Sequence, residues 1–269
     1  GLNENLAREV MELHTLGVGA AYSQEDVRQL AELFTGLSVD SDRAFVFRPN
    51  MAEPGAEQVL GRSYGGGAAT LDDVHAVLDD LARHPATRQH LAQKLAVHFV
   101  ADQPDPALVS ALNTALAESD GDLMAVYAAL LGHPSSWAET RQKVRQPFDY
   151  IAATLRLLDA PIPTDPKLPL RLFVHPLADM GQTIDGPPGP DGWPEEATHW
   201  ITPQGMAARI QWAIKAPSVL IGDLPDPRAL VDLALGKAAS EDLRFAAAAA
   251  ENRAVGVALL LSAPEFHRR

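Results

Sequence analysis

At 269 residues, of which 46% are hydrophobic, the chain is long enough to bury one large core or two closely joined ones. Its formal net charge of −13, with lysines and arginines scattered along the sequence, argues against nucleic acid or an anionic membrane as a partner. The absence of cysteine excludes disulfides, a thiolate nucleophile and cysteine-ligated metals. No run approaches the roughly 18 apolar residues of a membrane-spanning helix.

The first predicted element is a helix over residues 2–16 with two contrasting sides. Apolar side chains recur along it at spacings of three and four, which draws one stripe on a helix of period 3.6. These side chains are Leu2, Leu6, Val10, Leu13 and Leu16. Glu4, Arg8 and Glu12 fall on the opposite side, and Gly17 ends the helix. We expect the apolar stripe to face a core.

The polar groups of this helix form the first candidate site. Its residues are Asn3, Glu4, Asn5, Arg8, Glu9, Glu12 and His14. One interpretation is an exposed ladder of ion pairs, worth ~0.3–0.5 kcal/mol per pair. The other is a covering layer that makes Arg8 a buried clamp between Glu4 and Glu12. Spacing alone favours the exposed ladder, because charged residues are seldom fully buried unless they are paired.

Proline and glycine divide the rest of the chain into further predicted helices. Capping boxes at Ser23–Asp26 and Thr70–Asp73 begin two of them. The others are predicted over residues 86–100, 106–117, 122–131, 148–158, 203–215, 227–235 and 240–262. Only Arg43–Arg48 and Gln58–Leu60 are strand-like, and together they predict one small β-hairpin. The expected fold class is mainly α, a multi-helix bundle with long Pro- and Gly-rich loops.

The segment from Phe173 to Pro203 is the second candidate site, because it is long and rich in proline and glycine. Loops of this length inside a domain are usually functional or disordered, and two tryptophans argue against disorder. Its candidate ligand-binding residues are His175, Gln182, Asp185, Asp191, Trp193, His199 and Trp200. We favour a loop that Trp193 and Trp200 staple onto the bundle. The alternative is a pocket wall on which a tryptophan stacks against a sugar or another flat apolar face.

Motifs for catalysis, cofactors and metals are not recognisable in the sequence. The histidines and aspartates of the long loop are ligand types for zinc or iron, yet no two of them have a recognised ligand spacing. Gly65–Gly67 lacks the Lys-Ser/Thr that completes a phosphate-binding loop. No metal site is therefore predicted, and catalytic residues and cofactors stay unassigned.

Several segments together resemble one bacterial family. The first two predicted helices read NENLAREVMELHTLGVGAAYSQEDVRQLAELFTG, and later stretches read QPFDYIAATLRLL, MGQTIDGPPGPDGWPEEATHWITP and LLLSAPEFHRR. In this order the motifs are similar to those of the bacterial domain of unknown function family 1800 (DUF1800). The resemblance covers nearly the whole chain, and it implies a fold more than a mechanism.

Two departures from the family pattern carry expectations of their own. The resemblance implies a preceding half with a Trp-His-Asn-His-like motif, so residues 1–269 are expected to form a single helical domain at the C-terminal end of a longer protein. It also implies a histidine and a lysine where this chain has Ala52 and Glu57. Finally, it implies a periplasmic or secreted protein, with a cytoplasmic location left open.

Two functions follow as hypotheses. The favoured one is a non-catalytic binding or accessory module that acts with a partner protein or with the preceding half, and that binds a small molecule or a glycan. The alternative is a hydrolase-like enzyme in which Glu4, Glu9 or Glu12 acts as general acid or base beside Arg8. Arg8 would lower the pKa of such a carboxylate, whereas the chemistry needs it raised, so this hypothesis ranks second.

Overall fold

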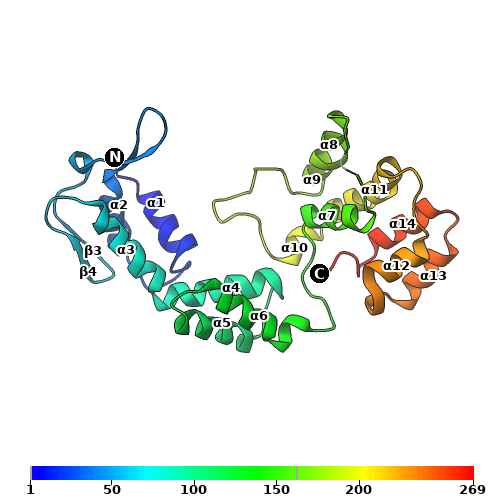
Figure 1. Ribbon diagram of the computed structural model, residues 1–269, viewed down its shortest axis with the longest axis horizontal. Coiled ribbons are helices and arrows are strands. Elements are labelled where there is room, and N and C mark those ends of the chain that lie inside the picture. The colour runs from blue at the N-terminus through cyan, green and yellow to red at the C-terminus, as the bar shows by residue number, and fades with distance from the viewer. Residues whose placement is uncertain (1, 162) are drawn as a thin grey trace. The chain divides into compact units, whose positions relative to one another are not determined.

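The computed structural model describes residues 2–161 and 163–269 and is mainly α-helical, as predicted (Figure 1). Its contacts divide it into two compact units. Unit 1 comprises residues 1–96 and 104–136, and unit 2 comprises residues 97–103 and 137–269. Each unit has a hydrophobic core of its own. No described helix combines the length and apolar character that a bilayer crossing needs.

Unit 1 begins with α1 (Glu4–Glu9), which continues as a π-helical turn (Val10–His14). A π turn holds more residues than an α turn, so it shifts the faces of the helix that follow it. Ala7 and Met11 are consequently buried together with Leu16, which lies five residues beyond Met11. The predicted apolar stripe is wrong at its beginning, where Leu2 and Leu6 are 44% and 42% exposed.

Two β-hairpins follow α2 (Gln24–Leu33), which begins with the predicted capping box at Ser23. The strands are β1 (Leu37–Val39), β2 (Phe45–Phe47), β3 (Ala56–Val59) and β4 (Arg62–Gly65). β1 pairs antiparallel with β2, and β3 pairs antiparallel with β4. The two strand-like segments therefore lie in different hairpins, not in one. β3 packs on α2 and β4 packs on α3 (Figure 1).

The remaining helices of unit 1 agree with the predicted ranges to within a few residues. They are α3 (Leu71–Arg83), α4 (Pro85–Phe99), α5 (Pro106–Glu118) and α6 (Leu123–Gly132). The second predicted capping box is present, because the Thr70 side chain accepts the amide of Asp73 and the Asp73 side chain accepts the amide of Thr70. The amphipathic helices α2 and α3 both contribute to one core, in which Leu30, Val77 and Leu81 are buried.

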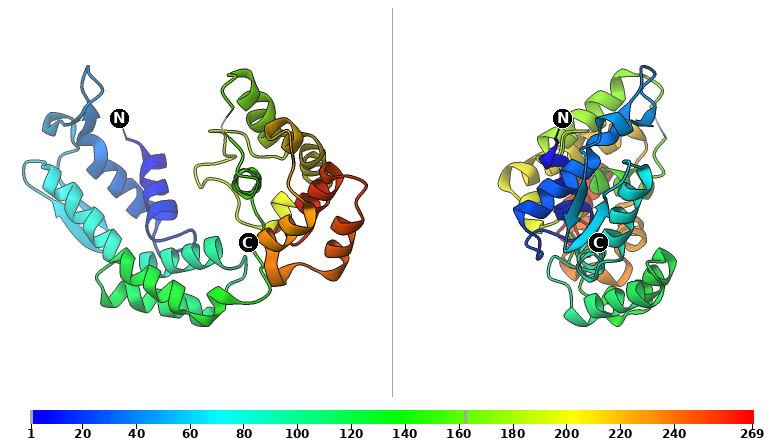
Figure 2. Two further views of the ribbon diagram at one scale, coloured as in Figure 1. Left: turned by 45° about the vertical axis from the view of Figure 1, so that its right-hand side comes forward. Right: turned by 90° about the vertical axis from the view of Figure 1, so that its left-hand side faces the viewer.

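Unit 2 is built from a larger set of helices. They are α7 (Pro147–Leu157), α8 (Lys167–Pro169), a π-helical turn (Leu170–Val174), α9 (His175–Asp179), α10 (Ala197–Trp200), α11 (Pro203–Leu220), α12 (Pro227–Leu235), α13 (Glu241–Ala249) and α14 (Arg253–Ser262). The single helix predicted over residues 240–262 is wrong, because Asn252 accepts the amide of Val255 at 3.0 Å and caps a new helix. α12, α13 and α14, coloured orange to red, stay together in both views of Figure 2.

At the centre of unit 2 lies Arg209 of α11, whose side chain is completely buried. Its Nη2 donates to the carbonyl of Arg145 at 2.9 Å, and its Nη1 contacts Nδ1 of His267 at 3.2 Å. The guanidinium also lies over the ring of Tyr150, 5.2 Å from the centroid. Because a guanidinium only donates, Nδ1 of His267 accepts and the imidazole proton resides on Nε2. Arg209 therefore ties α11 to α7 and to the C-terminal tail.

We expect acidification to destabilise unit 2 through His267. Burial, together with the nearby charges of Arg209 and Arg145, lowers the pKa of His267 from 6.5 to about 4. The unfolded chain therefore takes up a proton at higher pH than the folded chain, so this stabilisation is complete above pH 6.5 and is lost as the pH falls towards 4. The loss is on the order of 3 kcal/mol.

Urea unfolding at neutral pH and near pH 4.5 measures this loss. His267→Gln cannot take up the proton, so its free energy of unfolding will fall less between the two pH values than that of the wild-type chain. The exposed His199→Gln serves as the control and will keep the wild-type pH dependence. Equal losses in all three proteins would contradict the assignment.

Candidate functional site

The first candidate site is a chain of polar side chains that joins α1 and the following π-helical turn to the beginning of α2. Gln24 connects two of its members, because its Nε2 donates to Glu4 at 2.9 Å while its Oε1 accepts Nη2 of Arg8. Arg8 pairs with Glu12 at 3.5 Å, and the hydroxyl of Tyr22 donates to Glu12 at 2.6 Å. The structure therefore brings Glu4, Arg8 and Glu12 together through a layer formed by Tyr22 and Gln24.

The exposure of the Arg8 side chain is intermediate between the exposed ladder and the buried clamp considered from the sequence. A covering layer is present, yet 37% of the Arg8 side chain and 26% of the Glu12 side chain remain exposed. Burial and the bond to Glu12 raise the pKa of Tyr22 to about 12, so the phenol stays protonated as a donor. Asn3 caps α1 by accepting the amide of Leu6 at 3.1 Å. Asn5, Glu9 and His14 make no side-chain hydrogen bond or ion pair with the described residues.

Ala52 and Glu57 meet at one small cavity in unit 1. Ala52 and Glu57 both line a cavity of about 20 Å³ beside the β3–β4 hairpin, together with Glu32, Glu53 and Asp73. This volume is enough for about one water molecule. Glu57 is buried, and burial together with the charges of the surrounding carboxylates raises its pKa. The cavity is thus an acidic environment that makes ionisation of Glu57 harder than that of an exposed carboxyl group.

In the long loop of unit 2, the two tryptophans fasten the chain to the helices. Trp200 is 1% exposed, and its Nε1 donates to the carbonyl of Pro194 at 2.9 Å. Trp193 lies against it, with ring centroids 5.8 Å apart. Gln182 is also buried. Its side-chain amide is satisfied there, because Oε1 accepts the amide of Phe148 at 2.8 Å and Nε2 donates to Gln146. These residues hold the loop in place, and burial leaves no face of Trp200 for stacking on a ligand.

The remaining candidates in the loop lie on the surface. His175, Asp185, Asp191 and His199 are exposed, and Asp185 adopts a positive φ of 54° at a turn. The ring of His199 makes an edge contact with Trp200 at 4.7 Å between centroids. Within residues 2–161 and 163–269, no three His, Cys, Asp or Glu residues are placed so that they could hold a metal ion.

A buried lysine in unit 2 escaped the sequence analysis. Lys143 is 1% exposed, and its Nζ donates to Asp102 at 2.7 Å and to the carbonyl of Glu195 at 2.8 Å, with the Glu195 carboxylate 3.1 Å away. His98 Nδ1 lies 2.6 Å from Glu195. Burial alone raises the pKa of Glu195, but the hydrogen bonds from His98 and Lys143 outweigh burial and hold it below its usual range. The ammonium thus makes two hydrogen bonds and two ion pairs, which makes this cluster an anchor for the loop.

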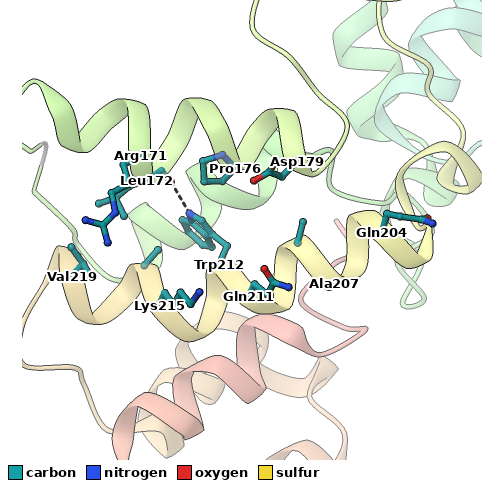
Figure 3. A pocket seen from close by; sticks show the side chains of 12 residues that line it. Arg171, Leu172, Pro176, Asp179, Gln204, Ala207, Gln211, Trp212, Lys215 and Val219 are labelled. Atoms are coloured by element: carbon teal, nitrogen blue, oxygen red, sulfur yellow. Dashed lines mark hydrogen bonds between the residues drawn. The ribbon is translucent and has the colours of Figure 1, made fainter.

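An open groove of unit 2 runs between α9 with its preceding π-helical turn and α11 (Figure 3). Its volume is about 510 Å³. Trp212 forms part of the floor and is fixed by a hydrogen bond from its Nε1 to the carbonyl of Leu172 at 2.7 Å. Small or compact side chains complete the floor between the polar groups. They are Leu172, Pro176, Ala207, Ala208 and Ala216.

Charged side chains lie at separate places along this groove. Arg171 and Lys215 lie towards one end, on opposite walls; Asp179 lies farther along, level with Gln211, and Gln204 lies at the other end (Figure 3). Gln211 points into the middle from α11 (Figure 3). Sequence analysis missed the groove because its residues are ordinary surface residues of helices. Only the spacing of Ala207, Gln211 and Lys215 at four residues marks one shared face of α11.

A different face of α11 forms an apolar surface with α14. Ile210 and Ile214 of α11 lie beside Val255 and Leu259 of α14, and all four side chains are exposed by at least 39%. Exposed apolar side chains that gather in one place are typical of surfaces that contact another molecule. The single helix α11 thus separates a polar groove from an apolar surface.

Comparison with known proteins places the whole chain in one family. The sequence profile described as "protein of unknown function (DUF1800)" matches residues 1–268. The chain belongs to the DUF1800 family. No curated protein and no solved structure matches it. The site geometry of this DUF1800 protein therefore has to be interpreted from its own residues.

The acidic cavity of this DUF1800 protein gives a prediction for Glu57. Because the pKa of folded Glu57 is raised, its contribution to stability is present below pH 4.5 and is lost as the pH rises. Glu57→Gln will therefore raise the free energy of unfolding at pH 7 and leave it unchanged near pH 4. The exposed Glu139→Gln is the control, and chemical unfolding at both pH values is the measurement. A less stable Glu57→Gln at pH 7 would contradict the prediction.

Removal of the buried ammonium gives a second prediction. Lys143→Met leaves Asp102 and Glu195 facing each other without a cation, which will destabilise unit 2 by about 3 kcal/mol. A destabilisation of about 3 kcal/mol is the low end of the range for removing one partner of a buried ion pair. We expect the low end because both carboxylates keep some contact with solvent. Lys237→Met, at an exposed position of the same unit, will change stability by less than about 0.5 kcal/mol. Similar unfolding midpoints for both variants would show that the ion pairs contribute little.

Proposed function

We propose that this DUF1800 chain is an exported, non-catalytic binding module, and that its ligand binds in the groove between α9 and α11. The groove itself carries the proposal. Its volume of about 510 Å³ falls within the range of about 300–1,000 Å³ that is typical of ligand pockets. An apolar floor with a few polar groups at fixed places is the composition that such pockets share.

The rigidity of the groove supports this choice over the long loop. One wall is the 18-residue helix α11, which Arg209 and Trp212 fix from inside the core. Sites on well-anchored helices hold their geometry better than sites on loops. The loop tryptophans serve packing instead, so a ligand or glycan is assigned to the groove.

The accessory part of the proposal, a partner protein, rests on the apolar surface of α11 and α14. Ile210, Ile214, Val255 and Leu259 would pack against an amphipathic helix of the partner. The carboxylate-based hydrolase ranks below this function, because Glu4 and Glu12 are already engaged with Gln24, Arg8 and Tyr22.

A fragment screen tests the binding function. Ligand-observed NMR with a library of small polar fragments will find binders of the wild-type protein. Ala207→Trp fills the groove from an exposed position of α11, so it will abolish their binding without unfolding the chain. Ala249→Trp, on α13, makes the same change away from the groove and will keep the binders.

Two results would contradict the proposal. One is binding that is equal in Ala207→Trp and in the wild-type protein. The other is turnover of any bound fragment or glycan by the purified protein, because a module without catalysis leaves its ligand unchanged.

A further inference from the structure

The charges of the groove are arranged as a dipole. Arg171 and Lys215 approach one end from opposite walls, and neither has an ion-pair partner among the described residues. Two donors on opposite walls can hold one anionic group between them. Farther along the groove from Arg171 lies Asp179, which also has no ion-pair partner within the described part of the chain (Figure 3). A ligand that matches both places is negative at one end and positive at the other.

The helices set the distance between these charges. Arg171 and Asp179 lie eight residues apart along one wall, which is at most about 12 Å at the α-helical rise of ~1.5 Å per residue, because the wall begins with the π-helical turn Leu170–Val174. Lys215 and Gln204 lie eleven residues apart along α11, or about 16 Å. An extended peptide advances ~3.3 Å per residue, so about four residues separate charges by this distance.

The middle of the groove suits a peptide backbone. Gln211 presents a side-chain amide that can donate and accept at once, as a peptide group requires. Ala207 and Ala208 keep this part of the α11 wall low, so a main chain can lie close to the helix. Trp212 adds an apolar floor for a small side chain.

Building on the proposed function of this groove, we propose that its ligand is a short zwitterionic peptide of about four residues. The peptide lies extended along α11 with its C-terminal carboxylate between Arg171 and Lys215. Its N-terminal ammonium faces Asp179, and its amide groups pair with Gln211. A peptide that lacks either terminal charge loses one of these contacts.

Isothermal titration with tetra-alanine, its C-terminal amide and its N-acetyl form tests the assignment. Each blocked peptide will bind about tenfold more weakly than tetra-alanine, because each loses a charge-assisted contact. In Lys215→Met, amidation will weaken binding much less than in the wild-type protein, while acetylation will weaken it as before. In Asp179→Asn, acetylation will weaken binding much less, while amidation will weaken it as before. Lys237→Met, at an exposed position of the same unit, will bind all three peptides as the wild-type protein does.

Two outcomes overturn the inference. In the first, tetra-alanine does not bind at millimolar concentration, although the fragments found in the screen bind the wild-type protein and not Ala207→Trp. The groove is then a ligand site for another chemical class. In the second, the amidated and acetylated peptides bind more weakly than tetra-alanine by the same factors in Lys215→Met and Asp179→Asn as in the wild-type protein. The peptide then binds elsewhere. Fragments that bind Ala207→Trp as they bind the wild type would remove the proposed function itself, so the two failures are distinct.

Discussion

The groove and the apolar surface of unit 2 both depend on how α11 is held. Arg209 and Trp212, three residues apart, project from one side of this helix into the core, and each makes a hydrogen bond to a backbone carbonyl. Rotation of α11 would leave a buried guanidinium without its partners, at a large cost in free energy. The two hydrogen bonds therefore fix the rotation of α11 that turns Lys215 to the groove and Ile214 to the apolar surface shared with α14.

Local signals in the sequence predicted where helices begin. The capping boxes at Ser23 and Thr70 work within four residues, so their outcome depends little on the rest of the chain. Asn252 uses the same kind of bond, yet the Ala- and Leu-rich stretches on both sides hid the break between α13 and α14. The π-helical turn at Val10–His14 had no sequence signal, because its extra residue per turn is decided by packing.

The candidate sites could be predicted only in part. Residues that attract attention in a sequence, such as the loop tryptophans and the alternating charges of α1, are used here mainly for packing and for joining segments. The groove depends on the approach of two walls that are remote in sequence at Arg171 and Lys215, and no local pattern reports such an approach. The same holds for Lys143, whose partners Asp102 and Glu195 lie 41 and 52 residues away.

The overall charge of the chain bears on what its groove can hold. With a net charge of −13, the protein repels a free anion over a distance of about one Debye length, roughly 8–10 Å. A zwitterion has no net charge and escapes that repulsion, while its two ends still gain from Arg171, Lys215 and Asp179. Discrimination against simple anions therefore comes from the whole surface, and orientation of the bound peptide comes from the two ends of the groove.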